Sequence, residues 1–302
     1  MKKNGVAARP GMAVTQNTGI LQGGSRQAGR TDTIYPISMT SCIAASCRYG
    51  SADSAIVLCS DRRVDYGSGY AANEAAWKIS AAGPGWMALM AGPTSRCKAL
   101  LSLYWRHLIE TPPLTDENAW SEMQIPLNRY KESLRSHKFP GDKSIELLLT
   151  GFIGGCPRIF KVAVTESDDD EAYDAGDFAC IGSGSSLSHG SLMNRIPNSS
   201  MQADEALYYV YEAKRWSELE TGVNKHTAIL IQRVGQSADG MIIERLRTGG
   251  QKRLADMYRR FGPQRFQSDR TAMSDIFFLT PEGEPYPQPP TGDPIPPPPS
   301  QE

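Results

Sequence analysis

The sequence has few of the features that mark a secreted, membrane-bound or nucleic-acid-binding protein. It has neither a signal-like apolar stretch near its start nor an apolar run long enough to cross a bilayer. Its formal net charge is −1, whereas nucleic acids and anionic membranes usually require a strong basic excess in their partners. We therefore expect a soluble, cytoplasmic protein that binds neither nucleic acid nor membrane.

Signals for disulfides, metals and nucleotides are also missing. The six cysteines form no CxxC pair, and several lie in apolar runs, where buried free thiols in a reducing compartment are expected. The four histidines are scattered at spacings that make no metal site. A Gly-Ser-Gly element at residues 182–184 is no phosphate loop, because Leu187 stands where GxGxxG needs its third glycine. We expect no cofactor and no metal.

The 302 residues divide into four parts. Residues 1–38 are rich in small and polar residues without apolar periodicity, which indicates a disordered N-terminal extension or a propeptide. Residues 39–248 are expected to form the main domain, and residues 249–276 a C-terminal helical extension. In residues 277–302 the prolines favour an extended polyproline form. This tail is either a flexible end or a docking peptide for a proline-binding groove.

Apolar periodicity predicts an α+β fold. Runs of strands are separated by pairs of helices, which favours antiparallel sheets with helices on their outer faces. Strands are expected at residues 40–47, 55–59, 86–92, 145–152, 158–165, 178–184, 227–233 and 240–246, and helices at residues 95–109, 118–137, 186–195, 204–219 and 251–261. Pro126 should kink or split the second helix. The acidic run at residues 166–171 is expected to be a solvated hairpin loop.

The most informative feature is the group of residues that follows Thr40. This threonine opens a β-prone run, and Asp61, Lys78 and Gly92 come after it, in or beside later strand-like runs. A threonine hydroxyl is a poor nucleophile that needs a base, a nearby cation and a donor for the developing oxyanion. If Thr40 were the first residue, its own α-amine, with a pKa of about 8, would be the base. Lys78, held by Asp61, would supply the cation, and the Gly92 N–H would bind the oxyanion.

These residues give the sequence a resemblance to the β subunits of the proteasome and their bacterial relatives, which are N-terminal nucleophile (Ntn) hydrolases. The family pattern is an N-terminal threonine, an acid and arginine cluster, a lysine and an Ala-Gly strand end. It is matched here by Thr40, Asp61-Arg62-Arg63, Lys78 and Ala91-Gly92. A strand ending in Gly-Ser-Gly and a long helix before a Ser-Gly pair are matched by Phe178 to Gly184, Asp204 to Leu219 and Thr221-Gly222.

The resemblance implies a four-layer αββα sandwich, in which two antiparallel sheets are flanked by helices. It also implies a threonine endopeptidase that hydrolyses the peptide bonds of unfolded proteins or peptides. The site would contain the nucleophile, its electrostatic partners, an oxyanion donor and three groups that order the amine: Thr40, Asp61, Lys78, Gly92, Ser183, Glu218 and Thr221. A homo-oligomeric ring or spiral and an ATPase unfoldase are the implied partners.

The sequence departs from this family pattern in three places. Glu218 and Thr221 replace an aspartate and a serine. The first hairpin is longer than the family usual, and we place the extra residues in a loop at residues 48–54. Met39 precedes Thr40 where proteasome precursors have glycine, so we expect that translation starts at Met39 or that the upstream segment is removed. If the extension stayed attached, the chain would be a non-catalytic structural subunit of a proteasome-like assembly.

Overall fold

A computed structural model describes residues 40–50, 53–62, 77–136, 144–165, 171–195, 200–220, 223–235 and 241–262. This part of the chain is α+β and contains two antiparallel sheets, as the sequence predicts. The N-terminal extension, the Pro-rich tail and most of the acidic run fall outside the described residues. Within these ranges no helix is long and apolar enough to cross a membrane.

The first sheet brings together strands from both ends of the main domain. Its order is β10-β9-β2-β1-β8, formed by β1 (Cys42–Tyr49), β2 (Asp53–Asp61), β8 (Phe178–Ile181), β9 (Thr227–Val234) and β10 (Met241–Arg245). The loop expected at residues 48–54 is wrong, because β1 and β2 stay paired up to Tyr49 and Asp53. Gly50, which follows β1, adopts a φ of 69°, a conformation that favours glycine.

The second sheet has the order β3-β4-β5-β6-β7. It is formed by β3 (Ile79–Gly83), β4 (Trp86–Ala91), β5 (Ile145–Ile153), β6 (Cys156–Val164) and β7 (Glu171–Asp174). The sequence did not predict β7, because only Ala172 in this short edge strand is buried and its apolar signal is weak. A helix holds β7 in place, since Gln124 Nε2 donates to the Ala172 carbonyl at 2.6 Å.

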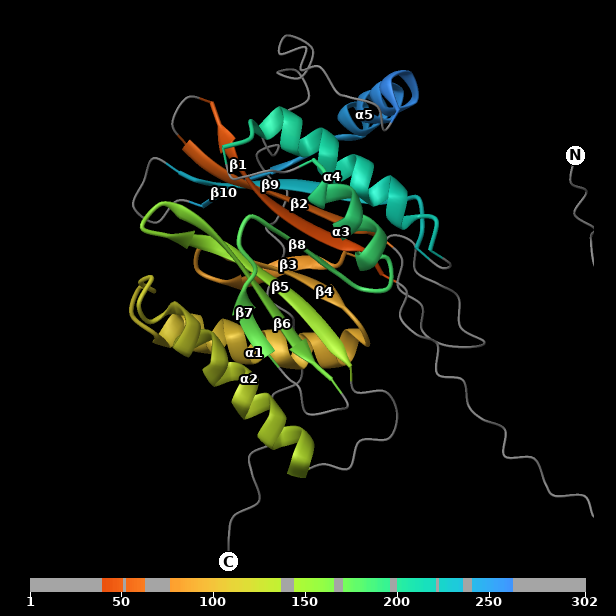
Figure 1. The fold of residues 1–302 in the computed structure, drawn as a ribbon. Coiled ribbons are helices and arrows are strands. Elements are labelled where there is room, and N and C mark those ends of the chain that lie inside the picture. Colours follow the sequence, from red (N-terminus) through yellow and green to blue (C-terminus); the bar gives the residue numbers. More distant parts are fainter. Residues whose placement is uncertain are drawn as a thin grey trace, which may run out of the picture. The chain divides into compact units, whose positions relative to one another are not determined.

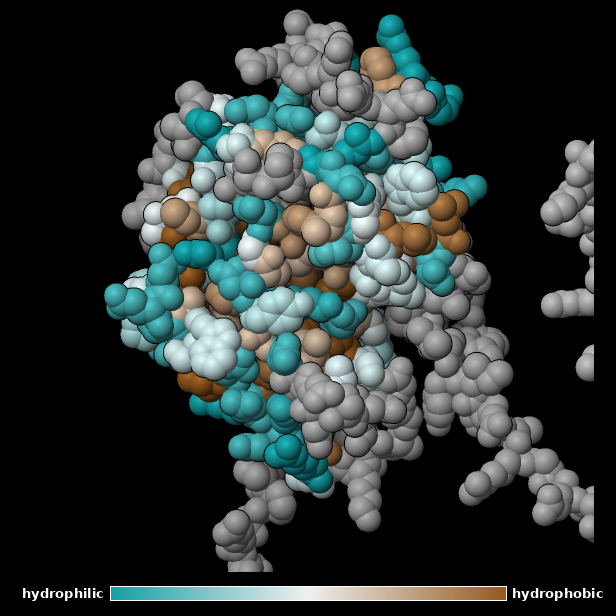
Figure 2. Space-filling model, in the orientation of Figure 1, coloured by the Kyte–Doolittle hydropathy of each residue, from teal (hydrophilic) through white to brown (hydrophobic). Residues whose placement is uncertain are grey.

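Helices cover the outer faces of both sheets (Figure 1). Helices α1 (Thr94–Glu110) and α2 (Ala119–Ser136) lie against the second sheet, and α3 (Ser185–Met193), α4 (Ala203–Ser217) and α5 (Thr248–Phe261) lie on the side of the first. Pro126 does not split the second helix, since α2 continues through it and the residue is buried. Hydrophilic side chains cover much of the helical surface at the top and bottom of the face in Figure 2.

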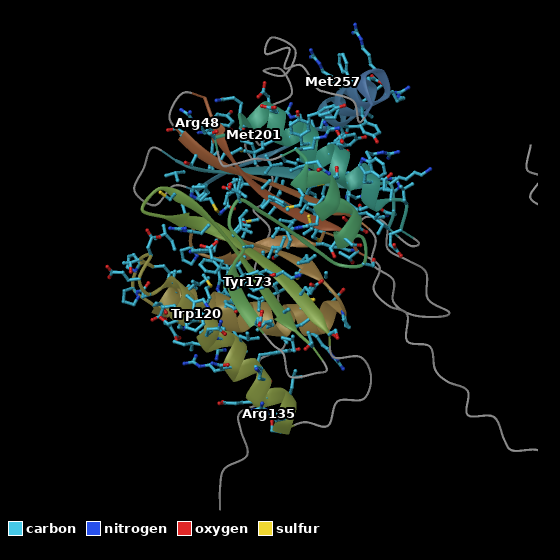
Figure 3. The ribbon with its side chains drawn as sticks, viewed as in Figure 1. Arg48, Trp120, Arg135, Tyr173, Met201 and Met257 are labelled. Carbon is cyan, nitrogen blue, oxygen red and sulfur yellow. The ribbon has the colours of Figure 1, made fainter. Side chains whose placement is uncertain are left out.

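Both faces of the central strands are buried, which explains their nearly continuous apolar sequences. In β1, Ile43 and Ala45 pack toward α4, whereas Cys42 and Ala44 belong to the core between the two sheets. The outer end of β1 is also fixed, because the Arg48 N–H donates to the Met201 carbonyl at 2.8 Å; these two residues lie close together in Figure 3. Strand β1 thus has a paired strand at each edge and a hydrophobic core on each face. This position determines which residues can lie around Thr40.

Candidate active site

Thr40 lies two residues before β1, at the edge where β1 begins and β2 and β8 end. Strand β1 pairs with β2 on one side and β8 on the other, with Cys42 opposite both Ser60 and Ile181. Because both pairings are antiparallel, extending the register by two residues brings Thr40 beside the ends of β2 and β8. The sheet topology therefore places Thr40 near Asp61 and Ser183, which are 122 residues apart in the sequence.

Lys78 connects Thr40 to Asp61. Its Nζ lies 2.7 Å from Thr40 Oγ1, and 2.9 and 3.0 Å from the two carboxylate oxygens of Asp61. Asp61 has no exposed surface and Lys78 is 4% exposed, so the ion pair is shielded from water. Asp61 Oδ1 also accepts the Ser41 N–H at 3.0 Å. The carboxylate thus fixes both the lysine and the chain beside the threonine.

The residue before Lys78 anchors it to the first sheet. Trp77 is stacked by two guanidinium groups, Arg62 at 5.3 Å and Arg245 at 4.3 Å from the ring centroid. Arg62 and Arg245 lie at the ends of β2 and β10, and such cation–π contacts each contribute about 0.5–1 kcal/mol. On the other side, the Lys78 carbonyl accepts the Met90 N–H at 2.9 Å. Lys78 is therefore held between the two sheets.

The turn after β8 encloses the main chain of Thr40. The Thr40 nitrogen donates to Ser183 Oγ at 3.1 Å, and the Gly184 N–H donates to the Thr40 carbonyl at 3.1 Å. Gly182 adopts a φ of 89°, and a Cβ at this position would lie 2.3 Å from the Thr40 carbonyl oxygen. Only glycine fits here, for both conformational and steric reasons. The Gly-Ser-Gly sequence is thus a close-approach turn built around Thr40.

Gly92 follows β4 in the second sheet. It has a φ of 115°, and a Cβ there would lie 2.9 Å from the Ser144 carbonyl oxygen. The strand that leads to it runs past the start of β1, because Cys42 Sγ donates to the Met90 carbonyl at 3.5 Å. The structure brings this strand end to the same region as Thr40, and oxyanion binding by the Gly92 N–H stays a prediction.

The last two predicted site residues are Thr221 and Glu218. Thr221 lies outside the described residues, as does Arg63. Glu218 caps the end of α4 and forms ion pairs with Lys214 at 3.0 Å and Arg215 at 2.6 Å. Lys214 has no exposed surface and also donates to the Asn224 carbonyl at 2.7 Å. Glu218 therefore fastens the end of α4 toward β9, and its ordering of an amine stays a prediction.

The nearby thiol is a poor competitor for the nucleophile. Cys42 is two residues from Thr40, but burial raises the pKa of its thiol well above the usual value, although Lys78 opposes this shift. A thiolate is the reactive form of cysteine, so Cys42 stays inert near neutral pH. All six cysteines are free, and Cys156 is exposed whereas the other five are buried. Among the described residues no group of three His, Cys, Asp or Glu side chains could hold a metal ion.

Sequence reasoning missed two charged residues around this site. Lys214 forms an i,i+4 pair with Glu218, and that spacing on a helix was a usable signal. Glu146, at the start of β5, accepts the Gly182 N–H at 2.8 Å. No local pattern could have identified Glu146, because its partner lies 36 residues away in the other sheet.

The comparisons with known proteins assign no family. No protein-family model matches this sequence, and no curated protein matches it as a relative. What the site can do is therefore argued from the contacts around Thr40 and from the sequence resemblance described above.

Proposed function

We propose that the chain is a proteasome-like threonine endopeptidase of the Ntn-hydrolase class, with the four-layer αββα sandwich of that class. The observation that carries the proposal is the position of Lys78, whose ammonium contacts Thr40 Oγ1 and both oxygens of a fully buried Asp61. A buried cation on a threonine hydroxyl is what a nucleophilic alkoxide would need. Paired sheets with helices outside support the sandwich.

In the proposed reaction a free Thr40 α-amine takes the proton from Oγ1, and Oγ1 attacks the carbonyl carbon of the scissile peptide bond. Lys78 stabilises the negative charge that develops on Oγ1, while Ser183 Oγ orients the nitrogen. The Gly92 N–H binds the oxyanion of the tetrahedral intermediate. This intermediate collapses to an ester on Thr40 as the leaving amine takes the proton, and water then hydrolyses the ester.

The proposal also covers the substrates, the assembly and the partner of the enzyme. Unfolded proteins or peptides are the substrates, as the family resemblance implies. A homo-oligomeric ring or spiral in the cytoplasm would keep folded proteins away from Thr40, and an ATPase unfoldase would supply the substrate. Glu218 and Thr221 would complete the order around the amine.

A non-catalytic structural subunit is the second candidate, and two observations favour it. In the full-length chain the Thr40 nitrogen belongs to the peptide bond with Met39, so it donates a hydrogen bond but cannot accept a proton. Thr40 also has no exposed surface in this chain. Cleavage between Met39 and Thr40, or translation from Met39 with loss of that methionine, is what separates the two candidates.

The deciding experiment compares natively expressed protein with a form that begins at Thr40. Intact mass identifies the N-terminal residue, and a peptide epoxyketone, which reacts with a hydroxyl and an adjacent free amine, reports the nucleophile. We expect labelling and peptide hydrolysis in the Thr40 form and neither in its Thr40→Ala variant. Thr227→Ala, a change at another mostly buried threonine, serves as the matched control and should keep both.

Two results would count against the peptidase. Labelling that survives Thr40→Ala would remove Thr40 as the nucleophile. Assembled native protein that still begins at Met1 and hydrolyses no peptide would favour the structural subunit.

A further inference from the structure

Glu146 is a charged residue that contacts the turn around Thr40 and that the proposed reaction does not use. It is the second residue of β5, and the two oxygens of its carboxylate have different partners. Oε2 accepts the Gly182 N–H at 2.8 Å, and Oε1 pairs with Lys161 Nζ at 2.8 Å. The Glu146 side chain is 29% exposed, so this hydrogen bond is partly shielded from water. The carboxylate therefore joins a strand of the second sheet to the turn that ends β8 in the first.

The Gly182 N–H needs the Glu146 carboxylate as its acceptor because Gly182 follows an edge strand. Strand β8 is at the edge of its sheet, has only β1 as a neighbour and ends at Ile181. The positive φ of Gly182 then turns the chain toward the Thr40 carbonyl. A partly buried N–H without an acceptor is costly. The Glu146 carboxylate satisfies it across the gap between the sheets, and a charged acceptor makes the bond stronger than one to a carbonyl.

The start of β5 also contacts the other strand end of the site. Glu146 is opposite Ala91 in the pairing of β4 with β5, directly before Gly92. The neighbouring residues Ser144 and Ile145 approach Gly92 so closely that a Cβ there would lie 2.9 Å from one and 3.1 Å from the other. The segment of residues 144–146 thus lies next to both Gly92 and Gly182.

We propose that Glu146 is a positioning residue that holds the turn at residues 182–184 against Thr40 and keeps it in register with Gly92. Its carboxylate acts through the hydrogen bond to Gly182, and Lys161 orients the carboxylate. The loss of this bond would free the turn whose Ser183 Oγ and Gly184 N–H contact the Thr40 main chain. The positional part of this inference concerns the fold, and its catalytic consequence rests on the proposed peptidase function.

Two substitutions separate the hydrogen bond from the charge. Glu146→Gln keeps an oxygen acceptor at full reach and removes the charge. Glu146→Asp keeps the charge but draws the acceptor back by one methylene. Glu122→Asp is the matched control, because Glu122 is a similarly half-exposed carboxylate, 24% exposed in its side chain, that pairs with His107 between α1 and α2.

Hydrogen–deuterium exchange of the full-length chain tests the position without any need for activity. Overlapping peptides that isolate the Gly182 amide should exchange about 10-fold or more faster in Glu146→Asp, since a hydrogen bond to a charged group is worth at least that factor. Exchange in Glu146→Gln should rise by less than in Glu146→Asp, because the amide oxygen keeps the bond but without its charge, and exchange in Glu122→Asp should stay close to wild type. Equal protection in all four proteins, or a loss in Glu146→Gln alone, would overturn the proposal.

Peptide hydrolysis by the form that begins at Thr40 tests the consequence. We expect kcat to fall about 10- to 100-fold in Glu146→Asp with little change in KM, because small displacements of positioned groups cost rates of this order. Glu146→Gln should restore most of the activity at an unchanged melting temperature. If wild type is inactive while the exchange result holds, the peptidase proposal fails and the positioning role stands. If wild type is active and Glu146→Asp is too, the positioning role in catalysis is wrong.

Discussion

Replacement of Lys78 by methionine is the sharpest test of the charge arrangement beside Thr40. Methionine has a similar length and no charge, so the change removes the ammonium with little loss of packing volume. Asp61 would then lose the partner that lies 2.9 and 3.0 Å from its oxygens, while keeping the Ser41 N–H at 3.0 Å. Because Asp61 has no exposed surface, water cannot replace the ammonium.

The structure predicts two separate losses from this change. Removing one partner of a buried ion pair is strongly destabilising and typically costs about 3–5 kcal/mol of unfolding free energy. Removing the cation from Thr40 Oγ1 should also lower kcat by about 100-fold or more. The double variant Lys78→Met/Asp61→Asn removes the buried charge while keeping an acceptor for Ser41. We expect its stability to return to within about 1–2 kcal/mol of wild type, since a buried pair contributes little net stability.

Urea unfolding and peptide hydrolysis, measured on the same preparations, distinguish these effects. The double variant should be stable and inactive, which assigns the loss of activity to the missing cation rather than to misfolding. Arg233→Met is the control. It breaks another ion pair with a buried carboxylate, because Arg233 of β9 lies 2.8 Å from the carboxylate of Glu244 in β10. It should lose stability and keep kcat. A double variant with more than about a third of wild-type activity would refute the role of Lys78 as the catalytic cation.

Two further predictions concern the tight turn and the thiols. Gly182→Ala should lower the unfolding free energy by at least about 2 kcal/mol more than Gly155→Ala. Both glycines have a positive φ, but a Cβ at Gly182 would lie 2.3 Å from the Thr40 carbonyl oxygen, whereas a Cβ at Gly155 would have no heavy atom within 4 Å. Equal costs in thermal unfolding would contradict the close approach. Iodoacetamide on the native protein at about pH 8 should modify Cys156 alone, since burial raises the pKa of Cys47, Cys59 and Cys97 to about 12. Peptide mapping that finds a second modified thiol would show that the core opens.

The sequence predicted the elements well where burial produces a clear period. Strands β5 and β9 and helices α1 and α4 lie within a few residues of the ranges expected for them. The errors have local causes. Pro126 does not split α2, which continues through it with the residue buried. The expected loop at residues 48–54 is a paired hairpin, because polar residues such as Ser54 can extend a ladder beyond the apolar core.

The candidate site was predicted less evenly than the fold. Spacing alone could not bring Thr40, Asp61 and Lys78 together; the family resemblance grouped them, and in the structure Lys78 contacts the other two. Glu218 shows the opposite case, because the sequence pattern suggested a role near the amine whereas its described contacts are with Lys214 and Arg215. For Glu218 the helical spacing to Lys214 and Arg215 was a better guide to its contacts than the family pattern.

The sequence alone could not predict how one sheet is aligned with the other. Apolar packing between the sheets is non-directional, so it fixes their relative position less specifically than polar contacts do. Polar contacts fix the position, because a buried polar group must keep its partner. At one end these contacts are Lys78 with Asp61 and Glu146 with Gly182. Further along β5, Thr150 Oγ1 donates to Gln232 Oε1 at 2.7 Å, with both residues fully buried. Thr40, Asp61 and Ser183 belong to the first sheet and Lys78 and Gly92 to the second, so the contacts that align the sheets also assemble the site.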